Sequence, residues 1–159
     1  MGNEKIFVGI DQSFNSTGII LLDEKAEIIE QKNFSLKDYK EIEEKLIHFE
    51  EEISFVPNIV KLKNVFIEGP AYMSNGQYAL QMGALHFLLR LFLYKNKVPY
   101  KVIAPGTLKK FITGKGNAKK DLILLKVYKK WGVEFDIDDL ADAYGLARMA
   151  LEEYINGNK

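Results

Sequence analysis

Three short apolar runs follow one another near the N-terminus, and their spacing limits the folds open to the chain. The runs are Lys5–Asp11, Thr17–Leu22 and Glu27–Phe34, separated by five and four residues. Each is rich in the β-branched and aromatic residues that favour strands. Connections this short allow only antiparallel pairing, because parallel neighbours need a much longer crossover. The sequence therefore predicts an antiparallel meander of three strands.

The rest of the chain alternates helical and extended patterns. Asp38–Phe55 has apolar residues at three- and four-residue spacing, which is typical of an amphipathic helix. The elements expected after it are a buried strand at 65–70, a long helix at Asn75–Lys97, a strand at 99–104, a short helix opened by Pro105, and helices at about 118–131 and 137–155. This order predicts one α/β domain over residues 1–159, with a mixed five-stranded sheet flanked by helices.

The composition excludes several classes of protein. With 159 residues, 47% hydrophobic and 28% charged, it is that of an ordinary globular domain. The absence of Cys excludes disulfide scaffolds, thiolate metal sites and a Cys nucleophile. The N-terminus lacks the features of a signal peptide, and the most apolar stretch, Ala79–Tyr94, is too short to span a bilayer. We expect a soluble, cytoplasmic protein that does not contact membranes.

The zero net charge conceals two regions of opposite sign. Between Asp23 and Glu52 there are eleven acids and five bases, whereas between Lys95 and Lys130 there are eleven lysines and one acid. Most charge runs are solvated faces with no further role. A run as one-sided as Lys95–Lys130 would also attract a phosphate backbone, so it favours a nucleic acid as the partner.

Acidic residues stand where burial is expected. Asp11 closes the first apolar strand and Glu68 closes the strand at 65–70. A carboxylate in such a place is costly to remove from water unless it is paired, hydrogen-bonded or bound to a cation. Both acids therefore need a partner.

A further group of acids opens the last helix. Asp139 and Asp142 are three residues apart and Asp138 and Asp142 are four apart, so either pair projects from one helix face. An N-cap or the helix dipole would account for Asp138 or Asp139 taken alone. Asp142 lies among apolar and small residues that form a packing surface, where an acid needs another explanation.

Together the acids predict a site for hard divalent cations. Mg²⁺ and Mn²⁺ take oxygen ligands, and two such ions activate water and stabilise the leaving oxygen of a phosphodiester. His48 and His86 lie on apolar helices away from other metal-ligating residue types, so we expect structural or surface roles for them and no zinc site.

Four motifs follow one another along nearly the whole chain. They are Gly9-Ile-Asp11 with Thr17-Gly18, then Ile67-Glu68, then Gly114-x-Gly-x-Ala118-x-Lys120, and last Asp139-x-x-Asp142-Ala143. In this order and at these intervals the chain resembles the RuvC-type Holliday junction resolvases of the RNase H-like superfamily. The resemblance implies an RNase H-like fold whose sheet has three antiparallel and two parallel strands.

The resemblance also implies a function. The implied function is that of a homodimeric endonuclease in DNA recombination and repair. Such an enzyme uses Mg²⁺ or Mn²⁺ to nick two strands of a four-way DNA junction symmetrically. By position, the metal-binding acids would be Asp11, Glu68, Asp139 and Asp142. Lys120 matches the family's lysine near the scissile phosphate, where a positive charge could stabilise the developing anion. Lys119 is a close rival for that role.

Further contacts are expected from the same comparison. The DNA-binding residues would be Tyr72, Lys109, Lys110, Lys115, Lys119 and Lys120. Tyr72 could stack on an unpaired base, a contact worth roughly 1–3 kcal/mol, or pack under the following helix. The helix at Asn75–Lys97 is apolar nearly all round, so its second side is expected either in a dimer interface or buried within the domain.

The chain departs from the family at two places. Asp11-Gln12-Ser13 replaces the usual Asp-Pro-Gly, and the segment between Glu68 and the aromatic is one residue longer. These differences resemble the divergent resolvases of bacteriophages, and they leave open a nuclease that acts on a wider range of branched DNA. An RNA-processing nuclease of the same fold and a non-catalytic DNA-binding module are further alternatives. A binding module would gain nothing from four acids that repel phosphate.

Overall fold

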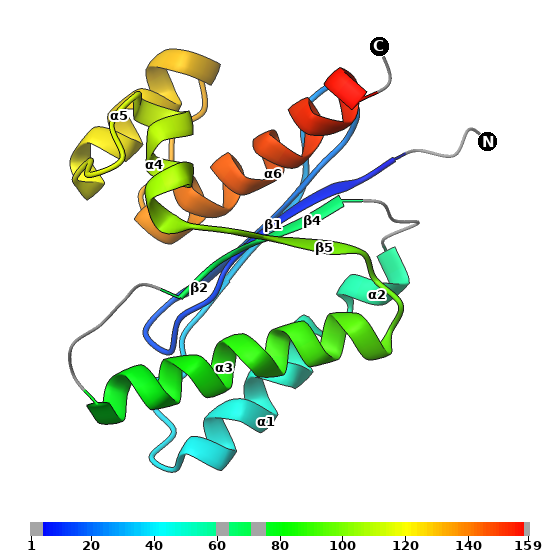
Figure 1. The fold of residues 1–159 in the computed structure, drawn as a ribbon, viewed down its shortest axis with the longest axis vertical. Helices are drawn as coiled ribbons and strands as arrows, with labels where there is room; N and C mark the ends of the chain where they lie inside the picture. The colour runs from blue at the N-terminus through cyan, green and yellow to red at the C-terminus, as the bar shows by residue number, and fades with distance from the viewer. Residues whose placement is uncertain (1–4, 60–63, 71–75, 158–159) are drawn as a thin grey trace.

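The structure is a computed structural model that describes residues 5–59, 64–70 and 76–157 (Figure 1). Along the chain the elements are β1 (Phe7–Asp11), β2 (Thr17–Leu22), β3 (Ile28–Phe34), α1 (Ile42–Ile53), α2 (Val56–Ile59), β4 (Asn64–Glu68), α3 (Gly76–Lys95), β5 (Tyr100–Ile103), α4 (Pro105–Thr113), α5 (Lys120–Trp131) and α6 (Asp138–Gly157). The five predicted strands are all present. The first helix begins later than Asp38, because Glu41 and Glu44 form a capping box that starts it at Ile42.

The five strands form one sheet in the order β3-β2-β1-β4-β5. Strands β1, β2 and β3 pair antiparallel, whereas β4 pairs parallel with both β1 and β5. This confirms the predicted mixed sheet. Strand β1 lies at its centre with all five residues buried, which explains why it reads as a continuous apolar run.

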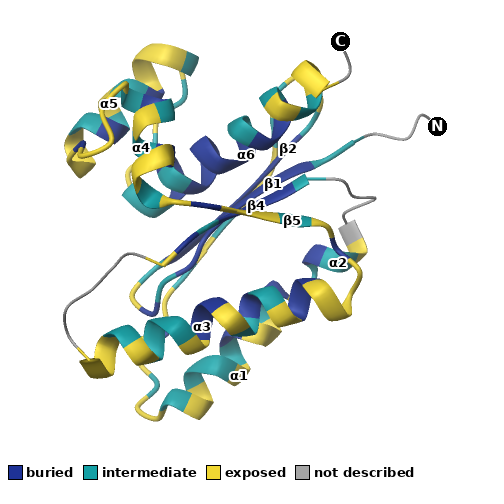
Figure 2. Cartoon of the chain, in the orientation of Figure 1, coloured by how far each residue is buried: buried dark blue, intermediate teal, exposed yellow. Residues whose placement is uncertain are grey.

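Helices cover both faces of the sheet and enclose two separate cores (Figures 1 and 2). Helices α1 and α3 lie on one face, and α4, α5 and α6 lie on the other. Alternate residues of β1 enter different cores: Phe7 packs with the side chains around α6, whereas Val8 and Ile10 pack with those of α1 and α3. The carboxyl ends of β1 and β4 therefore lie between the two helical layers.

Helix α6 crosses β1 and β2 at close range. A Cβ atom at Gly9 would lie 1.9 Å from the Ala143 carbonyl oxygen, and one at Gly18 would lie 2.3 Å from the Asp139 carbonyl oxygen. Only glycine leaves room for the helix backbone at these two positions. This contact places the first turns of α6 beside the end of β1.

Within the described residues, no helix has both the length and the hydropathy needed to cross a membrane.

Candidate active site

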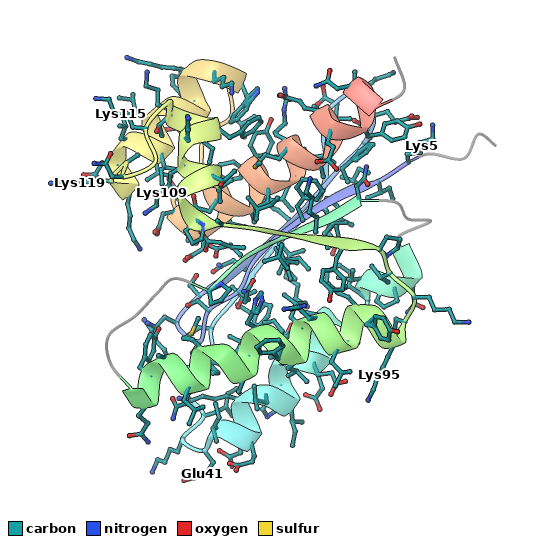
Figure 3. All side chains as sticks on the ribbon, viewed as in Figure 1. Lys5, Glu41, Lys95, Lys109, Lys115 and Lys119 are labelled. Atoms are coloured by element: carbon teal, nitrogen blue, oxygen red, sulfur yellow. The ribbon has the colours of Figure 1, made fainter. Side chains whose placement is uncertain are left out.

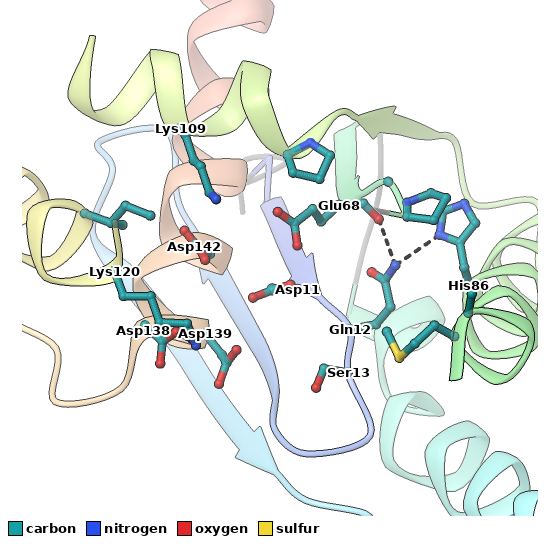
Figure 4. Close-up of a pocket in the computed structure, with 16 residues that line it drawn as sticks. Asp11, Gln12, Ser13, Glu68, His86, Lys109, Lys120, Asp138, Asp139 and Asp142 are labelled. Carbon is teal, nitrogen blue, oxygen red and sulfur yellow. Dashed lines mark hydrogen bonds and ion pairs between the residues drawn. The ribbon is translucent and has the colours of Figure 1, made fainter. Parts of the chain in front are cut away.

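A pocket opens where β1 and β4 end, and acids line it from three elements (Figure 4). Asp11 comes from β1 and Glu68 from β4, while Asp138, Asp139 and Asp142 come from the first two turns of α6. The structure thus brings all the predicted metal-binding acids together. It does so because parallel strands present their carboxyl ends at one edge of the sheet, and α6 starts there.

Asp11 and Glu68 form a pair of neighbouring carboxyl groups in the pocket. Burial raises the pKa of Asp11 well above its usual range, and the nearby Glu68 charge and hydrogen bond raise it further. Burial also raises the pKa of Glu68, although the hydrogen bond from Asp11 and the Lys109 charge oppose this rise. Without a cation, the pair is expected to retain a proton between its oxygens.

Asp142 is the third acid of the pocket whose pKa is raised. Burial and, next, the charge of Glu68 raise its pKa to about 7. Its Oδ1 atom is buried and has no hydrogen-bond partner among the described residues. A buried oxygen without a partner has an unmet need for a donor or a cation.

The donor set suits a hard divalent cation. All its atoms are carboxylate oxygens, which Mg²⁺ and Mn²⁺ prefer, and a cation would take the place of the shared proton and satisfy Asp142. Among the described residues, no three acidic or histidine side chains stand close enough to hold an ion as they are placed. The side chains would therefore have to draw together around the ion, as expected for carboxylates that repel one another without it.

Two lysines line the same pocket. Lys120 Nζ lies 2.5 Å from Asp138 Oδ2, and this hydrogen bond raises the pKa of the lysine. Lys109 lines the same pocket and its side chain points toward Asp142 (Figure 4), and its charge opposes the rise in the pKa values of Glu68 and Asp142. Lys119 is the N-cap of α5 and does not line the pocket. Of the two rivals, Lys120 is therefore the one beside the acids.

The other lysines of the basic run lie in separate places. A hollow between α4 and α5 is lined by Lys110, Lys126, Lys129 and Lys130. Lys115 and Lys119 lie on the α4–α5 side of the molecule, whereas Lys95 lies at the far end of α3 (Figure 3). Lys101 pairs with Glu153 at 2.5 Å. Tyr72 lies outside the described residues.

The pocket also contains residues that the sequence did not predict. Gln12 and His86 are buried beside it at 6% and 2% exposure, and Ser13 lines its wall. The structure places His86 in the wall of the acidic pocket, where its Nδ1 contacts Gln12, so the expectation that it lies away from metal-ligating residues is wrong; the half-exposed His48 contacts Glu51. The replacement of Pro-Gly after Asp11 was the one signal that could have indicated Gln12.

Helix α3 has one buried and one exposed apolar side. Leu85, Leu89 and Leu93 are buried in the core beneath it. On the opposite side the side chains of Leu80 and Tyr94 are 74% and 76% exposed. The expectation that α3 is completely buried within the domain is therefore wrong.

The sequence matches no family model. It is similar to curated proteins named crossover junction endodeoxyribonuclease RuvC. The relative from Petrotoga mobilis is 26% identical over 152 residues, covering 89% of this chain and 90% of the relative. The relative from Christiangramia forsetii is 27% identical over 160 residues, covering 98% of this chain and 82% of the relative. One from Chlamydia trachomatis is 35% identical over 100 residues, covering 60% of this chain and 59% of the relative.

Solved structures share the fold. RuvC of Thermus thermophilus, in complex with a Holliday junction substrate, superposes with a TM-score of 0.78 at 18% identity and covers 96% of this chain and 94% of its own. The yeast mitochondrial Holliday junction resolvase Ydc2 has a TM-score of 0.61 at 16% identity, covering 94% and 81%. The predicted RNase H-like fold is confirmed. The names of the relatives support the RuvC-type family and the predicted enzyme class, while the bacteriophage likeness stays a prediction.

Proposed function

We propose that this chain is a metal-dependent DNA endonuclease that resolves four-way junctions by paired, symmetric nicks. The observation that carries the proposal is the group of buried and half-buried acids at the ends of β1 and β4 and the start of α6, with two lysines beside it. A pocket that concentrates this many acids around desolvated oxygens suits cation-assisted hydrolysis of a phosphodiester. The curated relatives are named as crossover junction endodeoxyribonucleases.

Asp11, Glu68, Asp139 and Asp142 would hold Mg²⁺, with Mn²⁺ as a substitute. A bound ion supplies positive charge at the phosphate and lowers the pKa of water. Attack by water on phosphorus would leave a 5′-phosphate and a 3′-hydroxyl.

The pocket lysines would bind the phosphate. An ammonium group beside the acids offsets the negative charge that otherwise repels a phosphodiester. Lys109 already faces the acids, and Lys120 can exchange Asp138 for a phosphate oxygen because its side chain is 77% exposed.

The active form would be a homodimer that associates through α3. The exposed apolar stripe of α3 consists of Leu80, Ala84, Phe87, Leu91 and Tyr94. These positions alternate steps of four and three residues, which is the pattern of a seam between two packed helices. A second copy of the chain supplies a matching seam, and two-fold symmetry would place two pockets on the two strands of a junction.

The test uses purified protein with a labelled four-way junction, a three-way junction, a fork, a duplex and a structured RNA. Each substrate is incubated with Mg²⁺, Mn²⁺ or EDTA. Paired symmetric nicks only in the four-way junction, absent with EDTA, would support the proposal. Equal cutting of every branched DNA would point to a broader debranching nuclease, and cutting of RNA alone to an RNA-processing enzyme.

The variant that tests the role of the acids is Asp142→Asn, which removes a charge and keeps the shape of the side chain. We expect it to bind the junction as the unchanged protein does and to cut it hardly at all. Loss of binding together with cutting, in a folded variant, would contradict a purely catalytic role for Asp142.

A further inference from the structure

Gln12 connects the end of β1 with β4 and α3 through its side-chain amide (Figure 4). Its Nε2 atom lies 2.7 Å from the carbonyl oxygen of Glu68 and 3.0 Å from Nδ1 of His86. Both partners belong to the wall of the acidic pocket, and both side chains of the second contact are buried. The residue after the first acid is thus tied to the next acid-bearing strand.

The chemistry of the two partners fixes the orientation of this amide. A backbone carbonyl only accepts hydrogen bonds, so the nitrogen of Gln12 must face Glu68. The second amide hydrogen then points to Nδ1 of His86, which must carry a lone pair, and the ring proton lies on Nε2. Both amide hydrogens are used, and the Glu68 carbonyl, which cannot donate, prevents the amide from turning over.

This orientation leaves the amide oxygen of Gln12 without a partner. Oε1 is buried and accepts no hydrogen bond from any described residue, although Gln12 itself lines the pocket. A buried acceptor of this kind is costly unless a donor reaches it. The oxygens of a phosphodiester donate no hydrogen bonds, whereas water donates two.

We propose that Gln12 is a positioning residue for the hydrolysis. Its amide nitrogen holds the end of β4, so that the Glu68 carboxylate faces Asp11, and its amide oxygen accepts a hydrogen bond from water in the pocket. The inference rests on the proposed function, and it assigns a role to the position where the chain departs from Asp-Pro-Gly.

The test compares four variants. Gln12→Met removes both hydrogen bonds at similar volume, and Gln31→Met makes the same change on the exposed side of β3. His86→Leu removes the acceptor for the amide, whereas His86→Gln offers a carbonyl oxygen in its place. Each variant is measured for single-turnover cleavage at saturating junction, for junction affinity in EDTA, and for Mn²⁺ affinity by electron paramagnetic resonance.

We expect Gln12→Met and His86→Leu to lose roughly 10- to 100-fold in cleavage rate or Mn²⁺ affinity, as when an outer partner of a metal ligand is removed. Junction affinity should be unchanged, Gln31→Met should behave as the unchanged protein, and His86→Gln should recover much of the rate. Unchanged cleavage and Mn²⁺ affinity in folded Gln12→Met would overturn the proposal. A loss of junction affinity equal to the loss of rate would also overturn it, in favour of direct DNA contact.

One readout does not depend on DNA cleavage. In ¹⁵N-labelled protein, a scalar coupling between Nε2 of Gln12 and Nδ1 of His86 reports the hydrogen bond directly. If the unchanged protein cuts no junction, the proposed function fails, while this coupling and the Mn²⁺ affinities still decide the role of Gln12. Absence of the coupling, with Nδ1 of His86 protonated, would overturn the assignment.

Discussion

Lys120 and Asp138 form an ion pair beside the acidic pocket, with Nζ 2.5 Å from Oδ2. This pairing separates the roles of two adjacent acids, because Asp138 is engaged by the lysine while its neighbour Asp139 also lines the pocket. The first is suited to hold Lys120 in place and the second to hold a cation.

The distinction predicts different effects for two equivalent substitutions. Asp139→Asn should weaken Mn²⁺ binding and reduce cleavage by about 100-fold or more, because a metal-binding charge is lost. Asp138→Asn should retain Mn²⁺ binding and most of the cleavage. Calorimetric Mn²⁺ titration and single-turnover cleavage measure both. Stronger loss in Asp138→Asn would reverse the assignment.

The buried acids predict a stability that depends on pH when cations are absent. The folded pKa of Asp142 is about 7, above its ordinary value of 3.8, so the folded chain keeps a proton that the unfolded chain releases. The free energy of unfolding should therefore fall as pH rises from about 4 to about 7, by up to about 4 kcal/mol for this one group.

Urea unfolding in EDTA at pH 5 and pH 8 measures this fall. Mg²⁺ should restore stability at pH 8, since the ion favours the charged carboxylates. Asp142→Asn should lose less stability between the two pH values, with Asp11 and Glu68 still contributing. An equal fall in the variant would mean that other groups cause it.

The close contact between β1 and α6 predicts a severe effect for Gly9→Ala. The new Cβ would meet backbone atoms of Ala143 and Ala147, so the helix must move, at a cost of about 3 kcal/mol. Gly157→Ala is the control at the end of α6, because its Cβ would meet nothing within 4 Å. Urea unfolding should show a change within about 1 kcal/mol for the control.

The hollow between α4 and α5 predicts how salt affects DNA binding. Replacing Lys126 and Lys129 by Gln should weaken junction binding and reduce the slope of log K against log salt by about one for each lost phosphate contact. Replacing Lys95 and Lys97, from the far end of α3, is the control and should leave the slope unchanged. Equal slopes in both variants would contradict DNA binding at the hollow.

The exposed stripe of α3 predicts how the proposed dimer can be separated. Phe87→Glu puts a charge at the centre of the seam and should yield monomers in sedimentation equilibrium, because the charge would be buried without a partner. Leu125→Glu changes an exposed apolar residue of α5 and should leave the assembly unchanged. A monomeric unchanged protein at micromolar concentration would contradict the dimer.

Most of the fold could be predicted from the sequence, because buried strands appear as apolar runs and Asp11 and Glu68 stand out at their ends. The faces of α3 could not, since apolar residues on both sides of a helix give no periodic contrast. The short helix α2 also had no pattern of its own. Its four residues are too few to show a helical repeat.

The site was predicted in part for similar reasons. The four acids are recognisable by residue type and place, but neighbouring positions such as Asp138 and Asp139 differ only by a rotation about the helix axis. The basic run was expected as one surface, yet the turns between its elements separate Lys95 from Lys109. The pairing of Gln12 with His86 joins residues 74 positions apart, which a single sequence does not reveal.

The sheet lets the two sides of the molecule vary separately during evolution. A substitution in the core around α6 repacks the face with the acids and lysines, and a substitution in the core around α3 repacks the face with the apolar stripe. Side chains from both sides meet at the pocket, with Asp142 from one and His86 from the other. Substitutions can therefore alter the proposed subunit contacts or the proposed DNA contacts one at a time, whereas residues at the ends of β1 and β4 are constrained from both sides.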